Sequence, residues 1–274
     1  MGSTVGFVLG GGGVLGAVEV GMVRALFAAG IHPDLVVGTS IGALNGVVIA
    51  AVPPQEAEER LTELWSSTAA KDVFRANVAR QVGQLVRSGT HAHSAAPLRA
   101  LLEPIKDLRF EDLPTPFQCC AASIERAAER WFSEGPLIDA VLASCAVPGL
   151  LPPVKIDDEH YLDGGLVNSI PVARAIELGA DRVFVLQVGR IERPLQAPTK
   201  PWEVAMVAFE IARRHRFARD MAAIPDNVEV HVLPTGLSTE STNPLAYRSF
   251  SQIQTRIDSA YRASTAYLAE NGLI

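Results

Sequence analysis

The sequence has few of the residues on which several classes of protein depend. Its 274 residues include only three cysteines, Cys119, Cys120 and Cys145. This set is too sparse for a disulfide framework, and no His and Cys residues have the spacing of a zinc site, so we expect no metal. Acidic residues outnumber basic ones, and the net charge of −6 argues against a nucleic-acid partner.

Long hydrophobic runs are also missing. Gly, Pro or a charged residue interrupts every apolar stretch before it reaches membrane-spanning length. No basic region precedes the first apolar run, which argues against a signal peptide, and we expect a cytoplasmic protein. Hydrophobic residues make up 48% of the chain and aromatic residues only 6%, so the core is mainly aliphatic. Such a core suits parallel strands that lie beneath helices.

Short apolar strands alternate with helical patterns along the chain. Thr4 to Leu9 and Leu35 to Val37 predict buried strands, followed by helices at Leu15 to Ala29 and Ile41 to Val52. Further strands are predicted at 117–123, 130–133, 182–188 and 228–233, a hairpin at 156–162, and helices at 55–65, 137–144, 172–178, 202–223 and 245–271. The order predicts one α/β domain over residues 1–274, with a mostly parallel central sheet and helices on both faces. From its position, the segment 53–110 is either a helical cap over the site or ordinary helical packing.

The stretch LGGGGVLGAV, which follows the first strand, has two interpretations. Gly11, Gly13 and Gly16 have the G-x-G-x-x-G spacing of a dinucleotide-binding loop. The same loop could instead direct backbone N–H groups at the oxyanion of an ester under attack. The glycines alone do not distinguish a pyrophosphate from an oxyanion.

The end of the second strand decides between these interpretations. A dinucleotide site needs an acidic residue there, but Asp34 lies before the strand. The strand runs instead into GTSIG, a G-x-S-x-G sequence between a strand and a helix, which is the context of a nucleophile elbow. Gly38 and Gly42 let the chain turn sharply, so that the Ser40 hydroxyl projects above the sheet edge.

The glycine loop is expected to lie beside Ser40, because the loops that follow adjacent parallel strands meet at one edge of the sheet. Gly11, Gly12 and Gly13 are therefore candidate N–H donors to an oxyanion. Removing one such donor typically slows acyl transfer roughly 100- to 1,000-fold.

Ser40 also needs a general base, and three residues are candidates. His215 lies in the run ARRHRFAR and His231 lies within a predicted strand, so both positions favour structural roles. Asp163 is followed by Gly164 and Gly165, which would let the backbone turn and direct its carboxylate at Ser40. A partly desolvated carboxylate within hydrogen-bond reach can serve as the base.

Together these motifs resemble the patatin-like phospholipase family. They are G-G-G-x-x-G, G-x-S-x-G, A-S-x-A-x-P-G (Ala143 to Gly149) and D-G-G, and the resemblance runs from about Val5 to Val188. It implies a three-layer α/β/α fold, a Ser40–Asp163 dyad, an oxyanion hole from Gly11 to Gly13, and lipid ester hydrolysis without a metal or organic cofactor. The family often has Arg or Lys in its glycine loop, where this sequence has Leu15.

We therefore expect a serine acyl hydrolase that cleaves phospholipids, lysophospholipids or glycerides through an acyl-enzyme. An acyltransferase or thioesterase would use the same serine, and Leu15 motivates a third alternative, a catalytically weak lipid-binding protein. The run Arg213 to Arg219 would make transient contact with an anionic membrane surface or form a solvated helix face, which is the commoner role. No feature of the sequence predicts an oligomeric state.

Overall fold

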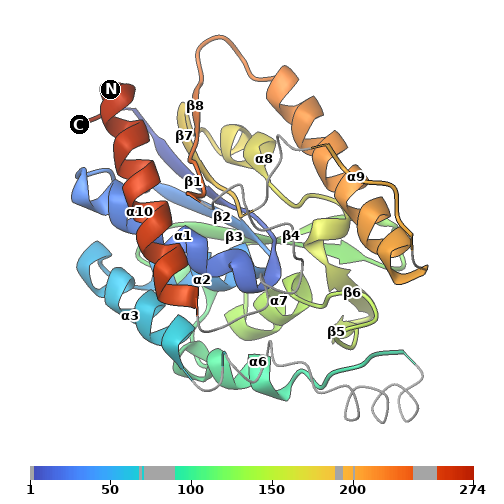
Figure 1. Cartoon of the computed structure of the whole chain (residues 1–274). Coiled ribbons are helices and arrows are strands. Elements are labelled where there is room, and N and C mark those ends of the chain that lie inside the picture. The colour runs from blue at the N-terminus through green and yellow to red at the C-terminus, as the bar shows by residue number, and fades with distance from the viewer. Residues whose placement is uncertain (1–2, 68–69, 71–89, 189–193, 200, 237–251) are drawn as a thin grey trace.

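The computed structural model describes residues 3–67, 70, 90–188, 194–199, 201–236 and 252–274. These residues form three layers, with helices on both faces of a central sheet (Figure 1). The strands are β1 (Val5–Leu9), β2 (Leu35–Thr39), β3 (Phe117–Ser123), β4 (Ala128–Phe132), β5 (Val154–Ile156), β6 (Glu159–Asp163), β7 (Arg182–Leu186) and β8 (Glu229–Val232). The α-helices are α1 (Ala17–Ala28), α2 (Ile41–Ala51), α3 (Pro54–Ser66), α6 (Ala96–Leu101), α7 (Leu137–Ser144), α8 (Val172–Glu177), α9 (Pro201–Ala222) and α10 (Ile253–Glu270). Short 3₁₀ turns are η1 (Gly13–Gly16), η2 (Glu103–Ile105), η3 (Phe110–Asp112) and η4 (Gly164–Leu166).

The sheet is parallel through most of its width and antiparallel at one end. Strands β3, β2, β1, β7 and β8 are neighbours in that order and run parallel, while β4, β5 and β6 join by antiparallel pairing. Every residue of β2 is buried, as expected for a parallel strand covered on both faces. The expected α/β fold is thus confirmed, with a mixed sheet because consecutive strands joined by short turns pair antiparallel.

Strand β3 brings the ends of β2 and β6 together. Its first half, up to Cys120, pairs with β2, and its second half, from Ala121, pairs with β6. Strand β4 pairs with both halves and therefore occupies the opposite edge. Hence β2 and β6 lie end to end along one edge of β3, and because β2 is parallel to β3 and β6 antiparallel, their carboxyl ends meet. The residues that follow Thr39 and those around Asp163 are thereby placed next to each other.

Two apolar cores cover the faces of the sheet. Helices α1, α2, α3, α7 and α10 build the larger core on one face, in which Trp65 is fully buried. Helices α8 and α9 cover the other face, where Phe217 packs with apolar residues of β1, β2 and β7 (Figure 1). Within the described part of the chain, no helix is both long and apolar enough to cross a membrane.

Several boundaries differ from the sequence predictions. The first helix was expected from Leu15, but the tight turn η1 comes first and α1 begins at Ala17. Gly13 has a φ of +60°, a conformation that favours glycine. A Cβ on Gly16 would lie 2.5 Å from the Ile41 side chain of α2, so the chain turns close to α2 before α1 begins. Helix α10 begins at Ile253, and the earlier part of the predicted 245–271 helix falls outside the described residues. Much of the predicted cap at 53–110 also falls outside the described residues. Helix α3, which begins this segment, packs on α1 and α2.

Candidate active site

Ser40 lies at a strained turn between β2 and α2. Its φ of 57° and ψ of −124° are unusual for a residue with a side chain, and such strain costs on the order of 1–3 kcal/mol. The turn requires glycine on both sides, since a Cβ on Gly38 would lie 2.4 Å from the Gly42 carbonyl oxygen. A Cβ on Gly42 would lie 2.3 Å from the Leu9 carbonyl oxygen. The chain therefore turns sharply at Ser40, between the two glycines.

Two residues of the A-S-x-A-x-P-G motif hold this turn in place. The Ser40 N–H donates to Ser144 Oγ at 2.9 Å, and Ser144 Oγ donates to the Cys120 carbonyl at 2.6 Å. The Cys145 thiol donates to the Ser40 carbonyl at 3.0 Å. In the sequence this motif carries the family resemblance and assigns no role to Ser144 or Cys145. The structure shows that its serine and cysteine, at the end of α7, support the backbone of Ser40.

The Ser40 hydroxyl donates to Asp163 Oδ2, with 2.5 Å between the oxygens. Both residues are buried, and Asp163 is only 2% exposed. The N–H of Gly165 donates to the other carboxylate oxygen at 2.7 Å, which fixes the orientation of the carboxylate. A Cβ on Gly164 would lie 2.2 Å from the Cys120 carbonyl oxygen, so this turn also needs glycine. The structure thus brings the predicted pair into direct contact.

The surroundings of Asp163 change its acidity. Burial raises the pKa of Asp163 from 3.8 to about 6, and the hydrogen bonds from Ser40 and Gly165 offset only part of this rise. The carboxylate is therefore a stronger base than an exposed aspartate and is still mostly ionised at neutral pH. A general base works best when its pKa lies near the pH at which it operates.

The glycine loop passes beside Ser40, as expected. A Cβ on Gly11 would lie 3.3 Å from the Cβ of Ser40. However, the Gly11 N–H donates to the Ser169 carbonyl at 2.9 Å, so the fold already uses this donor. Gly12 and Gly13 are exposed, and a Cβ on Gly12 would overlap Val188, with 1.8 Å between the carbons. Of the three predicted donors, the Gly12 and Gly13 N–H groups fit an oxyanion better than that of Gly11.

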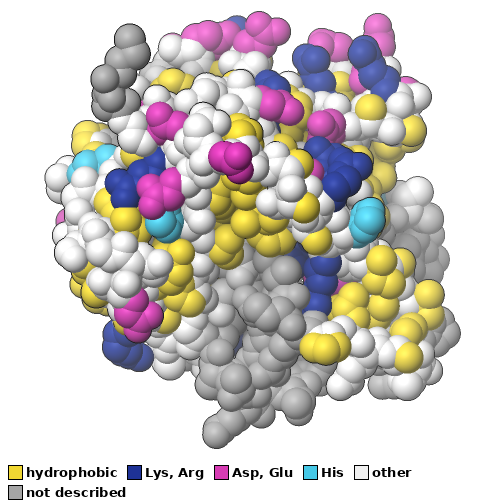
Figure 2. Space-filling model, turned by 90° about the horizontal axis from the view of Figure 1, so that it is seen from above, with side chains coloured by type: hydrophobic (Ala, Val, Ile, Leu, Met, Phe, Trp, Pro, Cys, Tyr) yellow, Lys and Arg dark blue, Asp and Glu magenta, His cyan; other side chains and the backbone are white. Residues whose placement is uncertain are grey.

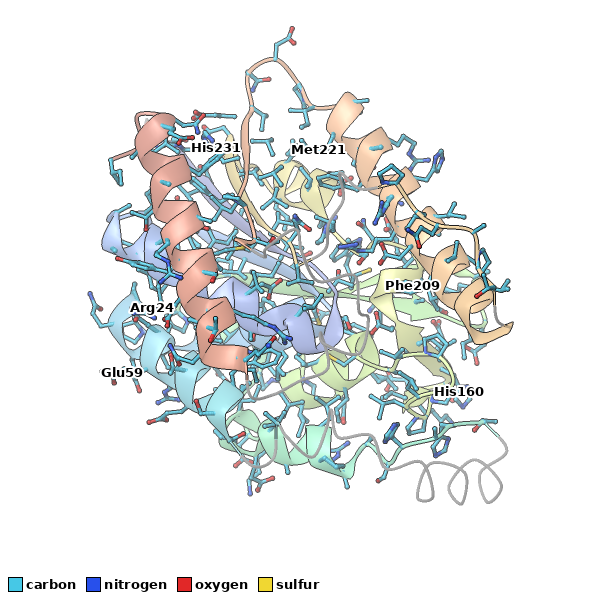
Figure 3. The ribbon with its side chains drawn as sticks, in the orientation of Figure 1. Arg24, Glu59, His160, Phe209, Met221 and His231 are labelled. Atoms are coloured by element: carbon cyan, nitrogen blue, oxygen red, sulfur yellow. The ribbon has the colours of Figure 1, made fainter. Side chains whose placement is uncertain are left out.

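Neither candidate histidine takes the place of Asp163. His215 is exposed on α9. His231 lies near α10 (Figure 3), where its ring stacks on Phe184 and its Nδ1 lies 3.3 Å from the Tyr267 hydroxyl. Both positions agree with the structural roles expected from the sequence.

The basic run of α9 forms the solvated face expected from the sequence only in part. His215 and Arg219 are exposed, but Arg213 is buried, with its Nε 3.2 Å from Ser169 Oγ, and Arg216 pairs with Asp220. The run covers more than one full turn, so some of its arginines must face the sheet when α9 packs there. No sequence signal distinguished Arg213 from its neighbours. Among the described residues, no group of His, Cys, Asp and Glu has the arrangement of a metal site.

A three-layer α/β fold with a hydrogen-bonded serine and aspartate at the carboxyl end of its sheet defines a class distinct from the Ser-His-Asp α/β hydrolases. The chain belongs to the patatin-like phospholipase family, whose model matches residues 7–176.

Known relatives agree with this assignment. The chain is 34% identical to lysophospholipase nte1 of Emericella nidulans over 199 residues. The matched segment is 70% of this chain but only 12% of that protein. It is 37% identical over 198 residues to a patatin-like phospholipase domain-containing protein of Caenorhabditis elegans, covering 70% of this chain and 14% of the relative. The crystal structure of VipD from Legionella pneumophila has the same fold, with a TM-score of 0.51 and 14% identity over 98% of this chain and 67% of VipD.

Proposed function

We propose that the protein is a serine acyl hydrolase that cleaves fatty-acyl esters of phospholipids, lysophospholipids or glycerides through a Ser40–Asp163 dyad. The 2.5 Å hydrogen bond between Ser40 Oγ and the buried Asp163 carboxylate carries this proposal, because it joins a nucleophile directly to a base. The family assignment supports the substrate class, and the relatives named lysophospholipase favour a lipid ester.

In the first half of the reaction, Asp163 accepts the Ser40 proton while Oγ attacks the ester carbonyl carbon. The N–H groups of Gly12 and Gly13 stabilise the oxyanion, and the N-terminus of α2 adds a favourable dipole. When the oxyanion collapses, the alcohol or lysolipid leaves with the proton held by Asp163, and the acyl group stays on Ser40.

In the second half, water replaces the departed alcohol. Asp163 accepts a proton from this water, whose oxygen attacks the acyl-enzyme. Collapse of the second oxyanion releases the fatty acid, and the Ser40 oxygen recovers its proton from Asp163. All proton transfers use one carboxylate, so no metal or organic cofactor takes part in the proposed reaction.

Exposed apolar side chains close in sequence to the site residues fit contact with a lipid surface. Leu166 of η4, three residues beyond Asp163, is 39% exposed. Leu150, which follows the A-S-x-A-x-P-G motif, and Ile211 of α9 are also exposed. Figure 2 shows hydrophobic side chains gathered near the centre and at the lower right, with Lys and Arg side chains between them. We therefore attribute transient membrane contact to these apolar side chains rather than to a basic face of α9.

A serine-reactive fluorophosphonate probe and a panel of lipid esters test the proposed function. We expect the probe to label Ser40 in the folded protein, and product mass analysis to find free fatty acid from at least one lipid class. Modification of Ser40 by the fluorophosphonate should stop the release of fatty acid in proportion to the fraction of Ser40 labelled. A folded protein that neither reacts at Ser40 nor releases fatty acid would favour the lipid-binding alternative.

The pH dependence should follow the ionisation of Asp163. Because the base must be deprotonated, kcat/KM is expected to fall about tenfold per pH unit below pH 6 and to level off above it. Fatty-acid release measured by mass analysis between pH 4.5 and 8.5 provides the profile. Because histidine is the commonest general base in enzymes, the profile is repeated with His215→Gln and His231→Gln. A midpoint lost in either variant would contradict the role of Asp163.

A further inference from the structure

A buried arginine of α9 has one guanidinium nitrogen without a hydrogen bond. The Arg213 side chain is 3% exposed, its Nε donates to Ser169 Oγ, and its Nη1 lies 3.3–3.4 Å from the Glu210 carboxylate. Its Nη2 is buried and has no hydrogen-bond partner among the described residues. Leaving such a donor unpaired costs about 1–3 kcal/mol or more, so its presence calls for an explanation.

Arg213 shares its acidic partner. Glu210 pairs with both Arg213 and Arg214. The next arginine, Arg216, has its own acidic partners in Asp220 and Glu129. Arg213 is therefore the place where a further anion would be best accommodated.

This guanidinium lies close to the dyad. Ser169, its partner, also accepts the Gly11 N–H through its carbonyl. A Cβ on Gly11 would lie 3.1 Å from Ser169 Oγ and 3.3 Å from the Cβ of Ser40, so the two serines approach the same point beside the glycine loop. Phe209 of α9 lies one helical turn before Arg213 (Figure 3). Its ring packs against the turn after Asp163, since a Cβ on Gly165 would lie 2.7 Å from it.

The Ser169 hydroxyl and the Arg213 Nη2 are two donors beside the glycine loop. Ser169 Oγ accepts from Arg213 Nε, so the hydroxyl proton of Ser169 is available for donation. In the planar guanidinium, Nη2 shares an edge with Nε and therefore faces the same side as Ser169. The charged Nη2 and the Ser169 hydroxyl, both on buried residues, therefore lie side by side next to the glycine loop.

We infer that Arg213 and Ser169 form a subsite for the phosphate of a glycerophospholipid headgroup, which makes Arg213 a specificity-determining residue. The inference rests on the proposed function, because it assumes that the ester lies at Ser40. In such a lipid, the glycerol carbons separate the phosphate from the scissile ester by only a few bonds. A phosphate beside Gly11 is therefore compatible with an ester carbonyl at Ser40. Arginine suits this role because charge-assisted bonds to phosphate are about twice as strong as neutral ones.

The test compares two substrates that differ only in the phosphate, 1-palmitoyl lysophosphatidic acid and 1-monopalmitoylglycerol. Arg213→Gln is expected to lower kcat/KM for lysophosphatidic acid at least tenfold more than for monopalmitoylglycerol, mainly through KM. Arg213→Lys should recover part of this difference, because it keeps the charge. Arg214→Gln removes a charge that pairs with the same Glu210 and should leave the ratio of the two substrates unchanged.

Binding separates this inference from the proposed function. In Ser40→Ala protein, which needs no turnover, lysophosphatidic acid below its micellar concentration should bind at least tenfold more tightly than in Ser40→Ala/Arg213→Gln. Calorimetry measures both affinities, and circular dichroism checks that each variant is folded. Equal losses for both substrates, or equal affinities, would show that Arg213 only supports the glycine loop and would overturn the subsite. Absence of hydrolysis in the wild type together with the expected affinities would instead overturn the hydrolase proposal alone.

Discussion

Ser40→Ala is expected to lower kcat for acyl-ester hydrolysis more than about 10⁴-fold while the protein stays folded. The reason is that no second nucleophile is in place. Among the described residues, the Asp163 carboxylate accepts from the Ser40 hydroxyl and from the backbone N–H of Gly165, which is not a nucleophile. The fold should be kept, because the Ser40 backbone bonds to Ser144 and Cys145 do not involve the hydroxyl. Fatty-acid release from a lysophospholipid, followed to complete conversion, measures the loss.

Ser264→Ala provides the matched control for this substitution. Ser264 is also a buried serine, but it lies on α10, and its hydroxyl lies 3.4 Å from the Pro234 carbonyl oxygen. This variant should keep wild-type turnover. Ser40→Ala protein that retains a tenth or more of the activity would assign the nucleophile to another residue.

Asp163→Asn is expected to lower kcat by about 10²- to 10⁴-fold, the range that general-base catalysis supplies. Asparagine can still accept from Gly165 and contact Ser40, but it cannot take the serine proton. The same variant should be more stable than the wild type at pH 8, by up to about 3 kcal/mol. Urea unfolding at pH 8 measures the second effect.

The sign of the stability change follows from the pKa of Asp163. The folded-state pKa of about 6 lies above the ordinary 3.8, so folding at pH 8 must bury a carboxylate that is better solvated in the unfolded chain. This cost lessens as the pH falls through 6 towards 4, and it is absent in Asp163→Asn. Stability sacrificed for a functional charge is a common feature of active sites.

Asp220→Asn gives the opposite expectation and serves as the control. Asp220 is also buried, but its carboxylate pairs with Arg216, so the substitution should destabilise the protein and leave the chemistry intact. If Asp163→Asn kept full activity, Asp163 would not be the base. If it lost activity together with stability, the loss would reflect damage to the fold.

The local motifs made much of the site predictable. The elbow around Ser40 and the turn after Asp163 depend on glycines next to the functional residue, where any side chain would overlap the backbone. Such requirements act over a few residues and therefore leave a readable pattern in the sequence. The alternation of strands and helices was readable for the same reason, because burial on both faces makes strands such as β2 continuously apolar.

At the glycine loop and at α9, local sequence motifs and tertiary contacts determine different features. The sequence by itself predicted the elbow at Ser40, offered Asp163 among the candidate bases, and predicted a glycine loop beside Ser40. Only the tertiary structure decided that the Gly11 N–H is already used by Ser169, that Ser144 and Cys145 support Ser40, and that Arg213 is buried beside Ser169. These contacts join segments more than a hundred residues apart or depend on how α9 is rotated against the sheet, and no local pattern specifies that rotation.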